Sequence, residues 1–206
     1  MMIGLILFAV GIVATIKADI GYAPWEVFHV GLADTMRMSI GLASILAGIV
    51  IVILVTALGE KFGFGTVTSM VLTGVFVDVI LLLDVIPTMD SLIFGILLLV
   101  GGLFAISAGS SFYIKSAFGV GPRDNLMVVM ARRTKLPVGV CRGIVEALTT
   151  LIGWLLGGMV GIGTIVSFIA IGPCVQLTFW VLKFDVTAVK HETMAETFAA
   201  LRGKKS

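Results

Sequence analysis

The chain repeats itself at a fixed offset of 98 residues, and this repeat constrains its fold more than any other feature. Sliding the sequence by that distance, without a gap, superposes identical residues across two turns and several apolar segments. The matched pairs are Lys17/Lys115, Gly21/Gly119, Pro24/Pro122, Gly41/Gly139, Gly59/Gly157, Gly63/Gly161, Gly65/Gly163, Thr66/Thr164, Ser69/Ser167 and Gly74/Gly172. A chance match would not keep register over this length, so the sequence predicts a tandem duplication of one structural unit.

The repeated unit is strongly apolar. Charged residues make up only 13% of the 206 residues and apolar residues 59%, whereas a soluble domain carries about 25% charged residues. Too little polar side chain is present to cover a surface in water, and apolar segments close to the ~20 residues of a transmembrane helix recur along the chain. We therefore expect a helical membrane protein with six spans, at residues 2–16, 40–58, 66–83, 92–113, 138–156 and 164–182.

Each half contains three predicted spans, an odd number, so the second half must enter the membrane from the opposite side. The predicted fold is an all-α integral membrane protein of six transmembrane helices, built as two inverted-topology three-helix repeats. Each repeat has a short amphipathic or re-entrant helix after its first span. The predicted divisions are 1–83 for the first repeat, 84–91 for a linker, 92–182 for the inverted second repeat and 183–206 for a cytoplasmic tail.

The distribution of basic residues is an independent indication of topology, because Lys and Arg accumulate in cytoplasmic loops. Lys17 and Arg37 fall on one predicted side, and the other twelve of the 14 basic residues fall on the opposite side. Both termini are therefore expected in the cytoplasm. The first span is short, and the repeat mate of Leu92 would precede Met1. We expect that the native first helix began earlier, or that this start is misassigned.

A turn containing Gly and Pro follows the first span of each half and interrupts the apolar pattern. Pro24 and Pro122 stand where a helix tolerates proline best, at its first position. Glu26 and Asp124 then place a carboxylate in the first helical turn, where it is favourable to the helix dipole. The helix that follows each turn is too short to cross a bilayer.

Two interpretations of these short helices stay open. Each is either an amphipathic helix lying among lipid headgroups, or a discontinuous helix whose free N–H groups form part of a binding site. Arg123 would strengthen an anion site in the second half, and its repeat mate in the first half is Trp25, so the two sites cannot be equivalent. Pseudo-symmetry predicts one such loop at each face. The candidate binding residues here are Trp25, Glu26, Arg123 and Asp124.

Three further candidates are ionisable residues within the predicted spans, where such groups are costly and often functional. Asp78 lies deep in the third span, and its repeat mate, Gln176, cannot titrate. Asp78 is either a proton or cation relay or a hydrogen-bonding partner between helices. Arg142 and Glu146 are four residues apart on the fifth span and therefore share a face. They form either a structural ion pair or part of a cytoplasmic vestibule together with the Arg123–Asp124 turn.

Several classes of function are not indicated by the sequence. The net charge of +2 does not suggest nucleic acid, and no Walker loop, dinucleotide fingerprint or nucleophile elbow occurs. His29 and His191 lack partners at metal-ligand spacing, and Cys141 and Cys174 lie within predicted spans, where packing is their expected role. We expect no cofactor, no metal and no enzymatic activity, although a membrane-embedded enzyme ranks as a third reading.

Three segments together resemble a known family of bacterial membrane proteins. These are "GYAPWEVFHVGL", "GVGPRDNLM" and "GWLLGGMVGIGT", with the Arg142–Glu146 spacing between the last two. They resemble the YczE/YyaS/YitT group, and most closely its YczE-like branch. The resemblance implies a multi-pass protein of the bacterial plasma membrane, and an export role is suggested for some members.

The sequence favours a secondary transporter for an unidentified small molecule, with export as one direction and a proton as one coupling ion. Inverted repeats, buried ionisable groups and the lack of an ATPase motif support this reading. The rival reading is a non-transporting membrane scaffold or regulator that acts through its cytoplasmic helix and tail. The lipid bilayer is the expected partner in both cases, and association with a second copy is another.

Overall fold

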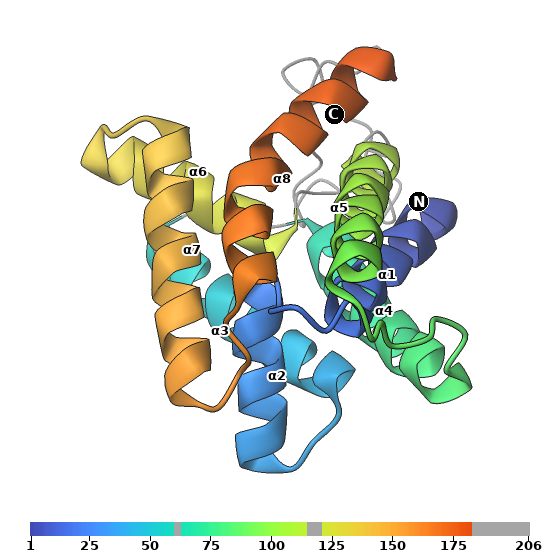
Figure 1. Ribbon diagram of the computed structural model, residues 1–206. Helices are drawn as coiled ribbons and strands as arrows, with labels where there is room; N and C mark the ends of the chain where they lie inside the picture. Colours follow the sequence, from blue (N-terminus) through green and yellow to red (C-terminus); the bar gives the residue numbers. More distant parts are fainter. Residues whose placement is uncertain (60–62, 115–120, 183–206) are drawn as a thin grey trace.

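The computed structural model describes residues 1–59, 63–114 and 121–182 (Figure 1). These residues form helices and connecting turns, with no strand among them. Lys61, Lys115, the tail from residue 183 and the side chain of Asp124, all used in the predictions above, lie outside the described part. The helices are α1 (Met2–Lys17), α2 (Pro24–Met36), α3 (Ile40–Ala57), α4 (Phe64–Leu83), α5 (Leu92–Ile114), α6 (Pro122–Thr134), α7 (Val138–Leu155) and α8 (Ile162–Val181).

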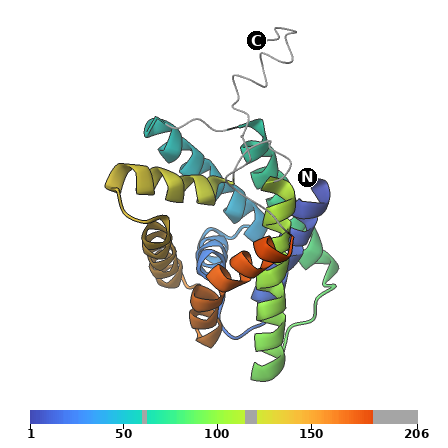
Figure 2. The ribbon, with the colours of Figure 1, turned by 90° about the horizontal axis from the view of Figure 1, so that it is seen from above.

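The six predicted spans correspond to α1, α3, α4, α5, α7 and α8, with every boundary within two residues of the prediction. Four segments are long and apolar enough to cross a membrane, namely Ile40–Ala57, Gly65–Leu83, Leu92–Tyr113 and Ile162–Val181. A fifth candidate is the pair α6–α7, which is bent by 119° and can be followed in Figure 2. Helix α1 is apolar but shorter. The described helices therefore provide four spans, or five with the bent pair.

The helix boundaries repeat at the offset found in the sequence. Shifting α2, α3 and α4 by 98 residues gives the bounds of α6, α7 and α8. The turns repeat as well, because Gly59 and Gly157 both have a left-handed backbone, with φ of 85° and 97°. The duplication read from the sequence thus extends to the secondary structure of the three later helices of each half.

Among the described helices, α1 and α5 form the most extensive contact between the halves. Gly4 faces Gly109, and Gly11 faces Gly102. Residue numbers therefore rise by seven along α1 where they fall by seven along α5. The two helices therefore run antiparallel. A Cβ atom built on Gly11 would lie 2.6 Å from the carbonyl oxygen of Gly102, so only glycine permits this approach. Small residues of this kind allow helices to pack closely in lipid.

Helix α2 lies in the interior and packs against α3 and against α7 of the other half (Figure 1). Its buried residues include Trp25, Glu26 and His29. Gly31 permits the contact with α7, because a Cβ atom there would lie 2.5 Å from the carbonyl oxygen of Gly153. This packing against protein favours the re-entrant interpretation of α2 over a helix lying among headgroups. Helix α6 packs correspondingly against α3 and α7, with Val129 buried and its last turn exposed.

Candidate functional site

The two short helices begin in the same way. Pro24 opens α2 and Pro122 opens α6, each preceded by a residue with extended backbone, Ala23 and Gly121. Neither preceding residue caps its helix through a side chain. The first backbone N–H groups of a helix have no partner within that helix. Each start therefore presents backbone N–H groups and the positive end of the helix dipole.

These two helix starts meet through Arg123, the second residue of α6. Its Nη1 lies 3.5 Å from Oε1 of Glu26 and its Nη2 lies 3.3 Å from Nδ1 of His29. Its Cζ lies 4.8 Å from the centre of the Trp25 ring, a cation–π distance. We call these four residues the arginine clasp. The clasp thus joins the two helix starts, and the expectation of one loop at each face stays a prediction.

The α2 members of the clasp lie on one helix face, since residues three and four apart are neighbours on a helix. Glu26 and His29 are only 3% and 2% exposed, whereas the Arg123 side chain is 24% exposed. Oε1 of Glu26 accepts no hydrogen bond among the described residues, although it lies in ion-pair range of Arg123. The Glu26 carboxylate is thus deeply buried, and its ion pair with Arg123 is longer than the 2.8 Å ion pair of Arg142 with Glu146.

Burial also shifts the titration of two groups on α2, a helix too short to cross the bilayer. Desolvation raises the pKa of the Glu26 carboxyl, and Arg123 opposes that rise. Desolvation lowers the pKa of His29 well below its usual value, and the positive charge of Arg123 adds to the effect. Arginine is only a donor, so the neutral imidazole accepts from it at Nδ1.

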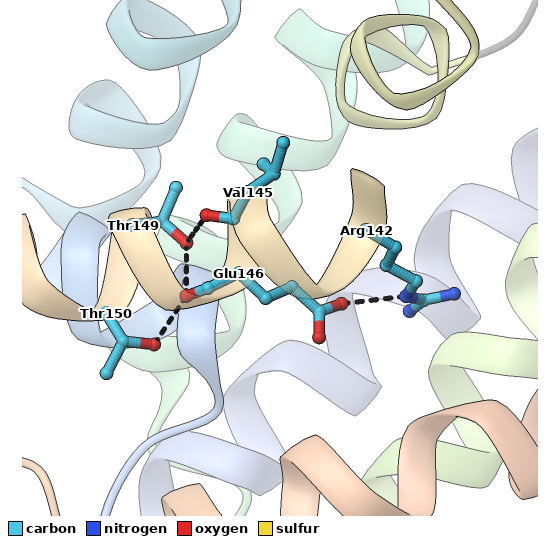
Figure 3. A network of polar contacts seen from close by, with 5 residues as sticks. All are labelled: Arg142, Val145, Glu146, Thr149 and Thr150. Carbon is cyan, nitrogen blue, oxygen red and sulfur yellow. Dashed lines mark hydrogen bonds and ion pairs between the residues drawn. The ribbon is translucent and has the colours of Figure 1, made fainter. Parts of the chain in front are cut away.

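The predicted pair on α7 adjoins the clasp. Nε of Arg142 donates to Oε1 of Glu146 at 2.8 Å, and Glu146 is 5% exposed. Figure 3 shows the Glu146 side chain directed toward Arg142, while the hydroxyls of Thr149 and Thr150 donate to backbone carbonyls of the same helix. The charge of Glu146 also contributes to the raised pKa of Glu26. Two buried carboxylates, one from each half, therefore lie near each other.

Asp78 and Gln176 lie outside this cluster. The carboxylate of Asp78, on α4, accepts from Oγ of Ser39 at 2.5 Å and from the backbone N–H of Gly41 at 2.7 Å, at the start of α3. Gln176 is exposed on α8. Gly48 of α3 lies near Pro122, at the start of α6. Gly48 is seven residues beyond Gly41, roughly 10 Å along α3. The Asp78 contact and the start of α6 therefore adjoin different parts of α3. Among the described residues, no group of His, Cys, Asp and Glu side chains could hold a metal.

Comparison with known proteins assigns the chain to a family. Residues 1–179 match DUF6198, which is described as a family of unknown function. The chain belongs to the DUF6198 family. The match includes α1 to α7 and most of α8, so both helix starts of the clasp lie within it.

This DUF6198 chain is similar to curated proteins from two bacteria. The uncharacterized membrane protein YczE of Bacillus subtilis is 31% identical over 171 residues, which are 82% of this chain and 79% of YczE. An uncharacterized protein of Haemophilus influenzae is 30% identical over 181 residues, 84% of this chain and 81% of that protein. YyaS of Bacillus subtilis is 26% identical over 170 residues, 80% and 83% of the two chains. No solved structure matches this chain.

The relatives confirm the resemblance to YczE and YyaS and agree with a membrane location. Sequence reasoning had identified three clasp residues but not their meeting, and it had set His29 aside. The spacing of Trp25, Glu26 and His29 on one helix face was the available signal for grouping them. Nothing local in the sequence indicated that Arg123, 97 residues after Glu26, would be their partner.

Proposed function

We propose that this DUF6198 protein is a secondary transporter of a small molecule and that the arginine clasp is its substrate centre. The observation that carries the proposal is the contact between Arg123 and Glu26. It joins two discontinuous helix starts, one from each half of a duplicated membrane protein. Secondary transporters with inverted repeats bind their substrates at such broken helices between the repeats.

In this proposal six helices cross the bacterial plasma membrane, and the two halves are related by inverted topology. Packing between the halves supports this, because α2 of the first half packs against α7 and α6 of the second half packs against α3. The substrate centre would then lie where one half moves against the other. Alternating access needs a centre in that position.

The energy source and orientation follow from the sequence. The chain has no ATPase motif, so an ion gradient is the proposed energy source. The distribution of the basic residues supports a topology with both termini in the cytoplasm. The proposed direction of transport is export, as the resemblance to YczE-like proteins suggests.

Flux through purified protein in liposomes tests the proposal. Liposomes with a trapped pH-sensitive dye receive organic anions, cations or neutral solutes in turn, under inward and outward proton gradients. For at least one solute class, the assay should detect transport of the solute or of protons across the membrane. The double variant Glu26→Gln, Arg123→Gln removes both charges together and should abolish that flux while keeping the folded yield. Absence of flux in every condition with folded wild-type protein would overturn the proposal. Stable capture of a partner protein would then support the scaffold reading.

A further inference from the structure

We infer that the clasp binds a small monoanionic carboxylate on Arg123 in exchange for Glu26, and that Glu26 takes up one proton in the same event. The inference deepens the proposed function and rests on it, because it names the substrate class and the coupling group. The step breaks one ion pair and forms another. The proton comes from the aqueous phase and ends on a carboxylate oxygen of Glu26.

Arg123 is the group that can receive an anion. Its guanidinium stands beside the starts of both α2 and α6, and it is the one clasp residue with a substantially exposed side chain. Helix starts of this kind attract negative charge. A carboxylate can engage arginine with two parallel hydrogen bonds, whereas Glu26 holds it at 3.5 Å with no hydrogen bond to Oε1. A substrate carboxylate can therefore compete with Glu26 for Arg123.

Charge balance explains why a proton must accompany the anion. Among the side chains that the structure describes, the charged groups that act on Glu26 are Arg123 from α6 and Glu146 from α7, which is paired with Arg142, and the neutral His29 lies on α2 itself. Of the other helices packed against α2, α3 and α8 carry no charged residue, and Lys17 at the end of α1 is paired with Asp84. Two arginines balance two glutamates among these described side chains. An added monoanion would leave one buried negative charge, which is costly, and protonation of Glu26 removes it.

Glu26 is better suited to this exchange than the other two candidate carboxylates. Glu146 has a hydrogen-bonded ion pair with Arg142 on its own helix at 2.8 Å. Asp78 accepts two hydrogen bonds, from Ser39 and Gly41. Glu26 is more deeply buried than Glu146, and no described residue donates a hydrogen bond to its Oε1. A proton on that oxygen would neutralise the buried carboxylate when Arg123 turns to the substrate.

The test measures binding and proton uptake together in detergent-solubilised full-length protein. Radiolabelled benzoate is the probe, acetate is a second carboxylate, and tetraethylammonium is the cationic comparison. Benzoate should bind with uptake of about one proton per molecule in a weakly buffered solution containing a pH indicator. Its affinity should fall by about tenfold per pH unit above the titration of Glu26, as expected for one coupled proton.

Variants separate anion binding by Arg123 from proton uptake by Glu26. Glu26→Gln should bind benzoate with no proton uptake and with an affinity that no longer depends on pH. Glu26→Gln, Arg123→Gln should not bind it, so this pair of variants differs only in the arginine. Asp90→Asn, at an exposed carboxylate in the linker, is the matched control and should behave as the wild type.

Three results would overturn the inference. They are failure of wild-type protein to bind either carboxylate, benzoate binding without proton uptake, and tetraethylammonium binding with proton release. Each of these can occur in a protein that still transports another solute in the liposome assay. Benzoate binding with proton uptake but no flux would instead contradict the proposed function. The two failures are thus distinguishable.

Discussion

The backbone N–H of Gly41 donates to Oδ1 of Asp78 at 2.7 Å, which ties the start of α3 to the middle of α4. Ser39 completes the contact, because its hydroxyl donates to the other carboxylate oxygen and accepts from the backbone N–H of Leu42. The carboxylate thus lies at the positive end of α3, where the helix dipole favours a negative charge. These contacts support the hydrogen-bonding interpretation of Asp78 over the proton relay.

Substitution of Asp78 distinguishes these two roles. Asp78→Ala should destabilise the protein by about 1–2 kcal/mol, as expected for loss of a helix N-cap, and thermal unfolding in detergent would measure this. Asp78→Asn keeps an acceptor for Gly41 and should unfold close to the wild-type temperature. Flux in liposomes provides the second readout. Complete loss of gradient-driven flux in well-folded Asp78→Asn would show that the carboxylate is the relay after all.

Removing one partner of the Arg142–Glu146 pair should lower the stability of the folded protein more than removing both partners. Arg142→Ala leaves the buried Glu146 without its partner, and breaking a fully buried pair costs about 3–5 kcal/mol. Arg142 is 32% exposed, so we expect a loss below that range. The double variant Arg142→Ala, Glu146→Ala should recover most of the folded yield on gel filtration. An equal or larger loss in the double variant would mean that the pair does more than neutralise charge.

The sequence predicted the local structure well because the signals for it are local. Apolar segment length and the Gly and Pro positions place all six long helices and both short ones. The spacing of Arg142 and Glu146 was enough to predict their ion pair, since both lie on one helix.

The position of the short helices could not be predicted in the same way. An apolar face is compatible with both headgroups and protein interior, and the choice here depends on close packing of Gly31 against Gly153 in the other half. The clasp likewise joins residues of both repeats. The pseudo-symmetry of the two repeats predicts the face at which each loop enters the membrane. It does not predict how far the start of each short helix reaches into the protein.

The antiparallel contact of α1 and α5 gives a matched pair of glycine variants. A Cβ atom on Gly11 would lie 2.7 Å from the backbone nitrogen of Ile106, whereas a Cβ atom on Gly101 would have no neighbour within 4 Å. Gly11→Ala should therefore destabilise the protein by roughly 1–3 kcal/mol through overpacking. Gly101→Ala should be neutral or slightly stabilising because alanine is the better helix former. Thermal unfolding of the two variants measures the contrast, and equal effects would contradict this contact.

Cysteine labelling tests the proposed inverted topology. Met36 and Leu136 are exposed residues near the ends of α2 and α6, and the proposal places them on opposite sides of the membrane. Single cysteines at these positions are introduced after replacement of the buried Cys141 and Cys174. An impermeant thiol reagent added to intact cells should label position 36 and not position 136, and lysed cells should show both. Labelling of position 136 alone in intact cells would contradict the inverted arrangement.

His29 should make the stability of the folded protein depend on pH. Burial and the charge of Arg123 lower its pKa well below the usual value of about 6.5, so protonation disfavours the folded state. The unfolded chain then binds more protons, and stability falls as the pH drops below about 6.5, by up to ~1.4 kcal/mol per pH unit. Above that pH the effect is absent, because His29 is neutral in both states.

His29→Gln isolates this contribution. Glutamine keeps an oxygen acceptor for Arg123 but cannot be protonated in this range. The raised pKa of Glu26 acts with the opposite sign, since stability from that group is lost as the pH rises above about 4.5. It is present in both proteins, so the difference between their unfolding curves reports His29. Unfolding temperatures from pH 5 to 8 should diverge only at the acid end. His191→Gln, which removes the second histidine of the chain, controls for titration elsewhere. Parallel curves for wild type and His29→Gln would show that His29 does not titrate on unfolding.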